Sequence, residues 1–243
     1  IIYKQNLKII DFIFYLNYHN REDDKFILEN IANNLSKKDG IVNRSFNKEK
    51  RIEESLNRNK IRLGICSNFL YTHSVTRCYL NLIKDLVDSG IEVIIFRGVY
   101  DMVDSTTKYI DSIVSNTIIL PESIQDSCNL ILNEFIDILF YLDIGMHAQT
   151  YLLSLSRLAL VQAVGGGHPQ TSGSPNIDYF LSSKYLEPKG SDMYFSERLI
   201  RMNRLHVNYP IPEIKSSIFN RSSFNIKDTD FIIGLPHTVF KYH

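Results

Sequence analysis

The sequence lacks net charge and paired cysteines, and each deficit excludes a class of protein. Lys and Arg total 27 and Asp and Glu total 27, whereas a nucleic-acid binder carries a basic excess or a basic face. We therefore expect no nucleic-acid partner. The three cysteines are odd in number and have no CxxC spacing, which argues against a disulfide framework or a zinc site and favours a reducing compartment.

The chain also lacks a long apolar run. The longest early one, Ile9 to Leu16, is interrupted by Asp11 and falls well short of the roughly 20 residues that span a bilayer. No basic segment with a small-residue cleavage site precedes it, so it is not a secretory signal. We expect a cytoplasmic protein with no membrane span.

Familiar catalytic signatures are missing as well. No GxSxG elbow is present, so a Ser-His-Asp triad cannot be argued. The glycine-rich stretch at 165–173 is not followed by the Gly-Lys-Ser/Thr of a phosphate-binding P-loop, and it does not have the GxGxxG spacing of a dinucleotide site.

What is present indicates an ordinary globular chain with an α/β core. The 243 residues, 44% hydrophobic and 22% charged, suffice for one large domain or two small ones. Apolar strand-like runs alternate with helical patterns over 60–205, which predicts a parallel sheet covered on both faces, a doubly wound, Rossmann-like domain. The predicted strands are Arg62–Ser67, Ile91–Phe96, Asn116–Leu120, Asp137–Leu142, Leu158–Val164, Tyr179–Ser182 and Leu199–Met202.

Helices are expected between the strands. One covers about Val75 to Val87 and ends at Gly90, which serves as its C-cap. Another is opened by Pro121 and continues from Ser123 to Phe135.

The flanking regions predict further parts. Residues 1–45 include apolar positions at helical spacing and read as a short helical segment, a hairpin broken at 20–23. The polar stretch 37–60 reads as a linker or surface segment, and 206–229 as a second linker. Residues 230–243 begin with a strand-like run, Asp230 to Leu235, which predicts the start of a second, truncated domain. Because the chain begins with Ile1 and stops at His243 just after that run, we expect both ends to be cut.

Four loops follow predicted strands and are the candidate site, because open α/β sheets bind ligands at the carboxyl ends of their strands. They are 68–74 with His73, 143–147 with His147, 165–173 with His168, and 236–241 with Lys241. We expect these loops to converge at one edge of the sheet.

The loop 165–173 carries the clearest chemistry. Three glycines let the backbone approach a ligand, and the hydroxyls of Thr171 and Ser172 can bind a sugar or phosphate oxygen. The alternative is a tight turn without a ligand, with His168 packed against the linker. Taken alone, His73 is consistent with a surface histidine and Lys241 with a solvated lysine. Asp143 is consistent with a residue that caps a loop, and nothing in the sequence around His206 indicates a role.

Several runs together resemble the catalytic region of the O-GlcNAc transferase family, which includes Spindly-type fucosyltransferases and bacterial cytoplasmic N-glycosyltransferases. The runs are GHPQTSG at 167–173, NIDYFLSS at 176–183, EP at 187–188 and YFSERL at 194–199. RLALVQ at 157–162 is similar to the family's RLAPVQ, with Leu160 in place of the proline. The resemblance covers about 61–241.

The resemblance implies the first lobe of a two-lobed, B-type glycosyltransferase whose second lobe is largely missing here. Its activity would be inverting, metal-independent transfer of GlcNAc or another hexose from a nucleotide sugar, a UDP-sugar, to a side chain of an acceptor protein or peptide, with no cofactor. The resemblance places Lys241 on the donor diphosphate. It gives His73 a role in positioning or deprotonating the acceptor, and sets Gly167, His168 and Pro169 beside the donor sugar.

Further expectations follow from the same likeness. Thr171, Ser172 and His147 are candidate substrate-binding residues. The N-terminal helices match the end of a tetratricopeptide (TPR) array or another acceptor-binding module. We expect the chain alone to be an inactive fragment. Two alternatives stay open: a glycan-building transferase of the same fold, and a non-catalytic truncated product that binds a partner through its helices.

Overall fold

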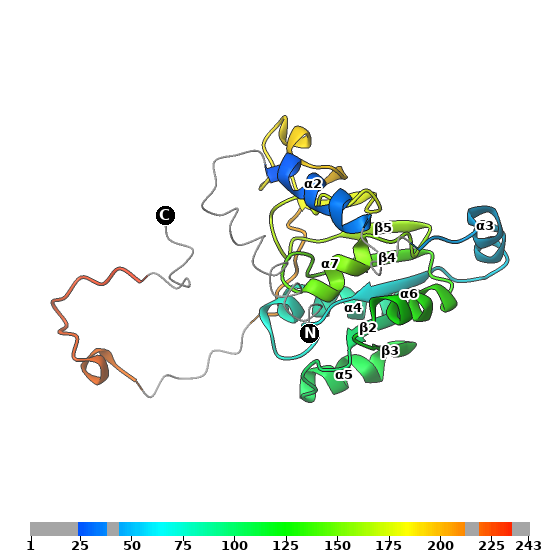
Figure 1. The fold of residues 1–243 in the computed structure, drawn as a ribbon. Coiled ribbons are helices and arrows are strands. Elements are labelled where there is room, and N and C mark those ends of the chain that lie inside the picture. The colour runs from blue at the N-terminus through cyan, green and yellow to red at the C-terminus, as the bar shows by residue number, and fades with distance from the viewer. Residues whose placement is uncertain (1–23, 38–43, 212–218, 235–243) are drawn as a thin grey trace. The chain divides into compact units, whose positions relative to one another are not determined.

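The computed structural model describes residues 24–37, 44–211 and 219–234, and the chain divides into two units, Ile1–Tyr209 and Pro210–His243. The first unit contains a seven-stranded sheet in the order β3-β2-β1-β4-β5-β6-β7, with every neighbouring pair parallel (Figure 1). Its strands are β1 (Arg62–Cys66), β2 (Glu92–Gly98), β3 (Asn116–Leu120), β4 (Ile138–Tyr141), β5 (Val161–Val164), β6 (Tyr179–Ser183) and β7 (Arg198–Met202).

Helices lie on both faces of this sheet. The helices of the first unit are α2 (Asp24–Ser36), α3 (Lys48–Leu56), α4 (Ser74–Asp88), α5 (Ser105–Ile113), α6 (Ile124–Asn133), α7 (Ala148–Ser154) and the 3-10 turn η2 (Ser191–Tyr194). Alternate strand residues point to opposite faces: Val93 and Ile95 pack with residues of α4 and α5, whereas Ile94 and Phe96 pack with α2, α6 and α7. The predicted α/β, Rossmann-like class is confirmed.

Capping side chains decide where the helices begin. Ser123 accepts the backbone N–H of Asp126 and starts α6, because a side-chain oxygen at this position satisfies a donor that the helix leaves unpaired. The prediction that Pro121 opens this helix is therefore wrong. Pro121 lies before the cap, and its carbonyl accepts from Ser127 Oγ and Gln149 Nε2.

The polar stretch 37–60 is not a linker throughout, because residues 48–56 form α3. The physical reason is a buried arginine. The Arg51 guanidinium lies over the rings of Phe46 and Phe135, at 4.7 Å and 4.5 Å from their centroids, and donates to the Leu132 carbonyl. Cation–π contacts of this kind anchor a helix that has no apolar stripe.

Helix α2 is packed into the core of the first unit. Leu28 and Ala32 are fully buried among residues of α6, α7 and the sheet, and Figure 1 shows α2 lying along the unit. The first half of the predicted helical hairpin lies outside the described residues. That residues 1–45 end a TPR array or another acceptor-binding module stays a prediction.

The second unit is described over 210–211 and 219–234 and contains the 3-10 turn η3 (Arg221–Phe224). Phe231 to Gly234 form no strand, so the predicted strand Asp230–Leu235 is wrong over its described part. A strand needs a hydrogen-bonded neighbour, and no other segment described in this unit pairs with it. Leu235 and Lys241 lie outside the described residues. Across the described ranges, no helix has the length and apolar character needed to cross a membrane.

Candidate functional site

The candidate site lies where the strand order reverses, between β1 and β4. The chain runs outward from β1 to β2 and β3 and then returns to β4 on the other side of β1, so the loops that follow β1 and β4 diverge and leave the usual ligand position between them. Asp143, at the end of β4, bridges this point: its Oδ2 accepts from Asn68 N at 2.9 Å and from Ser67 Oγ at 3.3 Å. Burial raises the pKa of Asp143 to about 7.

A polar network extends from this point across the ends of four strands. Asn68 Nδ2 donates to Asp101 Oδ1 at 3.1 Å and to Gln149 Oε1 at 3.0 Å. Gln149 donates in turn to the Pro121 carbonyl after β3, and Gly98 N at the end of β2 donates to Asp101. A Cβ on Gly98 would lie 2.5 Å from Asn68 Nδ2, so the network requires glycine there.

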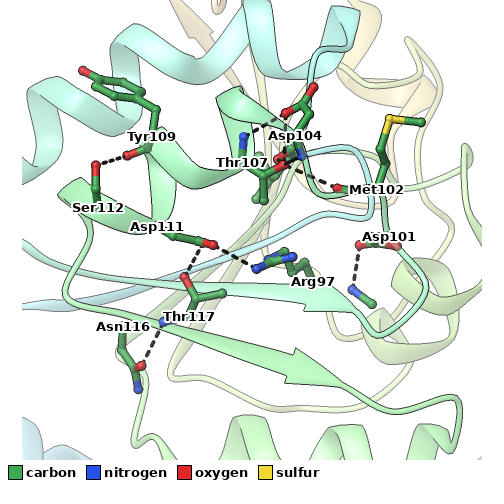
Figure 2. A network of polar contacts seen from close by, with 12 residues as sticks. Arg97, Asp101, Met102, Asp104, Thr107, Tyr109, Asp111, Ser112, Asn116 and Thr117 are labelled. Atoms are coloured by element: carbon green, nitrogen blue, oxygen red, sulfur yellow. Dashed lines mark hydrogen bonds and ion pairs between the residues drawn. The ribbon is translucent and has the colours of Figure 1, made fainter.

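Helix α5 and its N-cap hold the loop that carries His73. Thr72 N donates to Asp104 Oδ2 at 2.8 Å, and Thr107 Oγ1 donates to the Leu70 carbonyl at 2.9 Å. Figure 2 shows Asp104 and Thr107 capping each other at the start of α5, and the Arg97–Asp111 ion pair that ties α5 to β2. The hydrogen bonds from Thr72 and Thr107 hold the pKa of Asp104 far below its usual range. The loop is thus fixed before any ligand arrives.

His73 and His147 occupy equivalent positions, each at the start of a helix that follows a strand. The Nδ1 atom of His73 accepts from Val75 N and that of His147 from Gln149 N, both at 3.2 Å. The ring of Phe69 stacks on His73, with centroids 4.6 Å apart, and meets His147 edge-on at 6.4 Å. The loops after β1 and β4 therefore meet at one edge of the sheet, as predicted, and both contact the ring of Phe69.

The glycine-rich loop after β5 joins the same edge. A Cβ on Gly167 would lie 2.5 Å from the Leu142 carbonyl and 2.9 Å from Asp143 Cα, so this loop packs on the backbone of the β4 loop. A Cβ on Gly166 would meet His206 Nε2 at 2.3 Å. His168 is buried and Pro169 is exposed. Three of the four predicted loops thus lie together, while the fourth, with Lys241, lies outside the described residues.

Thr171 and Ser172 are engaged by the protein itself. Glu197, which is buried, accepts from Thr171 Oγ1 at 2.6 Å, from Ser172 N at 2.8 Å and from the Ser172 hydroxyl. Next along the loop, Gly173 has a φ of +68°, and a Cβ there would lie 2.4 Å from the carbonyl carbon of Leu28 in α2. The hydroxyls of Thr171 and Ser172 therefore hold the loop in place through Glu197. That they bind a ligand stays a prediction.

Other residues of the family-like runs also hold the fold. Arg157 makes a bidentate pair with Asp178, at 2.6 Å and 3.0 Å. Gln162 Oε1 accepts from Leu158 N, and its Nε2 donates to the carbonyls of Ser156 and Asn176. These bonds join the entries of β5 and β6, so the RLALVQ and NIDYF runs serve the sheet.

Sequence reasoning assigned no role to several residues at this edge, namely Asn68, Asp101, Gln149, Glu197 and His206. Asn68 and His206 follow predicted strands, and this position was the feature of the sequence that could have indicated a role at the site. Asp101 and Gln149 meet Asn68 across separations of 33 and 81 residues, and no spacing rule predicts such contacts. No group of three or more His, Cys, Asp or Glu in the described ranges is arranged to hold a metal ion.

No family model and no curated protein matches the sequence. Among solved structures, a lysine-to-methionine mutant of the O-GlcNAc transferase of Thermobaculum terrenum is similar to this chain, with a TM-score of 0.61 and 22% sequence identity. The match covers 79% of this chain and 36% of that one, so the chain spans about a third of that enzyme's length. At this identity the likeness shows the fold: the chain has a glycosyltransferase-like α/β fold.

Proposed function

We propose that this chain is the first lobe of a two-lobed glycosyltransferase that moves a sugar from a nucleotide sugar to a side chain of an acceptor protein. The observation that carries the proposal is the convergence of the His73, His147 and glycine-rich loops at the point where the strand order reverses. The likeness to an O-GlcNAc transferase structure supports it.

The chemistry that we propose is inverting and needs no metal. Departure of the nucleoside diphosphate develops negative charge, and a fixed cation or hydrogen-bond donor that meets this charge lowers the barrier. Lys241 is the candidate cation for the diphosphate. The hydrogen bonds among Asn68, Asp101 and Asp143 fix the loops after β1, β2 and β4 relative to one another, which supports a site whose groups are positioned before the substrate binds.

A transfer assay tests the proposal. Protein expressed from the complete gene is incubated with UDP-GlcNAc, UDP-glucose or GDP-fucose and with host proteins, and mass spectrometry detects on an acceptor the mass increase of the sugar residue that each donor carries. Transfer from one of these donors supports the proposal. Absence of both transfer and nucleotide-sugar binding contradicts it.

The variant Lys241→Ala tests the proposed cation. We expect a loss of about 10²–10³ in kcat, as for removal of a group that stabilises developing charge. Lys227→Ala, at an exposed position of the same unit, is the matched control and should keep the wild-type kcat. If Lys241→Ala also keeps it, Lys241 has no part in catalysis.

A further inference from the structure

The two histidines that contact Phe69 each make the same kind of hydrogen bond to the helix that follows. This bond determines which ring nitrogen carries the proton. In His73 and in His147 the Nδ1 atom accepts the backbone N–H two residues along the chain, at 3.2 Å in both. A ring nitrogen that accepts an N–H cannot bear a proton itself, so the neutral ring carries its hydrogen on Nε2. Both residues have the same φ of −143°, so the same local geometry occurs twice.

The second nitrogen of each ring is left for another partner. Nδ1 and Nε2 lie on opposite sides of Cε1, so the Nε2–H points away from the helix that Nδ1 caps. Within the described ranges, neither Nε2–H donates to a protein group. Phe69, half-buried, contacts both rings, so two donors from loops 74 residues apart in sequence (147 minus 73) border one aromatic surface.

Protonation of His73 is disfavoured by its surroundings. Burial lowers the pKa of His73, and a proton on Nδ1 would break the cap and place a positive charge at the N-terminus of α4. Tyr71 lies beside the ring, at 5.5 Å between centroids. Asp104 accepts the backbone N–H of the adjacent Thr72 and is held by the Thr72 and Thr107 donors, while Asp101 has His147 as an electrostatic neighbour.

We infer that His73 and His147 are neutral Nε2–H donors that, with Phe69, form a binding site for an oxygen acceptor, a hydroxyl or phosphate oxygen of the substrate. His73 is then not the base that accepts a proton from the acceptor side chain, because its outward nitrogen is already protonated. The tautomer rests on the two cap bonds, whereas the identification of the ligand with a nucleotide sugar rests on the proposed function.

Nitrogen-15 NMR of the imidazole rings tests the tautomers directly in the purified chain. We expect both rings to be neutral with the proton on Nε2 at pH 7. The opposite tautomer or an imidazolium at either residue overturns the inference. This result does not depend on the proposed function, since no ligand is needed.

Titration with UDP-GlcNAc and, separately, with inorganic phosphate tests the donor role. We expect the Nε2–H signals of both residues to shift at millimolar UDP-GlcNAc. If the signals respond to phosphate but not to UDP-GlcNAc, the two histidines are still donors to an oxygen ligand, but the ligand is not a nucleotide sugar. No response to either probe, with the tautomers as expected, overturns the binding site.

Two substitutions at each histidine separate the cap from the donor. His73→Asn and His147→Asn keep a good cap but remove the distal N–H, so we expect an unchanged melting temperature and a lost response to UDP-GlcNAc. His73→Gln and His147→Gln keep a distal amide donor and lose the cap, so the melting temperature should fall by about 2–4 °C while the response persists. A full response in the Asn variants overturns the donor role.

Discussion

At the scale of single residues, Glu197 determines the shape of the glycine-rich loop. It is 5% exposed and accepts from Thr171 Oγ1, Ser172 N and Ser172 Oγ. A buried carboxylate is tolerated when donors surround it, and these donors come from the loop that packs on Asp143 through Gly167. Glu197 thus stabilises the candidate site indirectly, by holding the glycine-rich loop.

We expect Glu197→Ala to lower the free energy of unfolding by about 2–3 kcal/mol, because it removes the acceptor of the buried Ser172 N–H and Ser172 hydroxyl. Urea denaturation measures the loss. Glu53→Ala, at an exposed position on α3, should change the stability by less than about 0.5 kcal/mol. Equal effects of the two substitutions would mean that the Glu197 hydrogen bonds do not stabilise the loop.

The carboxyl of Asp143 predicts a pH dependence of stability. Its pKa is raised by burial to about 7 in the folded chain and is about 3.9 when unfolded. Between these values the folded state binds more protons, so stability falls as pH rises, by about 1.4 kcal/mol per pH unit. Above pH 7 the whole cost is present, and below pH 4 it vanishes.

The variant Asp143→Asn isolates this group, because an amide oxygen can still accept from Asn68 and Ser67. We expect the stability of the wild type relative to the variant to decrease between pH 4 and pH 7. Chemical denaturation of both proteins across this range measures the difference, in which the other titrating groups cancel. A flat difference would show that folding leaves the pKa of Asp143 unchanged, and a difference that rises with pH would show that folding lowers this pKa; either result contradicts the prediction.

At the scale of elements, α2 is part of the core that supports the site. Its backbone at Leu28 packs directly on Gly173, and Gln170 Nε2 lies 3.4 Å from Asp24 Oδ2. The glycine-rich loop is therefore held between α2 on one side and Glu197 on another. Leu28 and Ala32 of α2 have no exposed surface inside this unit.

Leu28→Ala tests whether α2 is integral to this unit. We expect a loss of about 2–5 kcal/mol, as for a large core side chain that leaves a cavity. Asn33→Ala, at an exposed position on the same helix, is the control and should be nearly neutral. A small effect of Leu28→Ala, measured by urea denaturation, would show that α2 docks only loosely.

The elements also show what the sequence could and could not predict. All seven strands of the sheet were predicted because each is a run of apolar residues between polar loops. Helix α7 was missed because it has only seven residues, and its polar residues Gln149, Thr150 and Ser154 are buried together with its apolar ones. Helix α3 was missed because its anchor, Arg51, is a charged residue that pattern reading assigns to the surface.

The sequence was sufficient to predict which loops form the candidate site. Parallel strands bring their carboxyl-end loops to one edge, which correctly placed His73, His147 and the glycine-rich loop together. The contacts within the edge were not predictable, because they pair residues distant in sequence. Glu197 is the clearest case: its partners Thr171 and Ser172 lie 26 and 25 residues away, and the hydroxyls look equally suited to a ligand.

At the scale of the whole molecule, the first unit has its own core and ends at Tyr209. Its last contacts are Asn208 N to the Cys78 carbonyl at 3.1 Å and Cys78 Sγ to Tyr209 Oη at 3.0 Å. The stability of the first unit should therefore not depend on the second.

A chain shortened to residues 1–209 should melt within about a degree of the full chain, since it keeps every core residue of the sheet. A chain shortened to residues 1–203 loses the contacts of 206–209, including His206 against Gly166, and should melt at a lower temperature. Calorimetry measures the melting temperatures of the full chain and of the two shortened chains. A large loss in the 1–209 chain would show that residues beyond Tyr209 stabilise the sheet unit.

The packing of α2 on the glycine-rich loop also sets an order of events during synthesis. Asp24 and Gln170 are 146 residues apart, so the first described helix to leave the ribosome has to wait for five strands before its binding surface exists. Closing so long a loop costs chain entropy and slows folding. Until then the side of α2 that carries Leu28 and Ala32 is exposed on a nascent chain, where a chaperone can bind it.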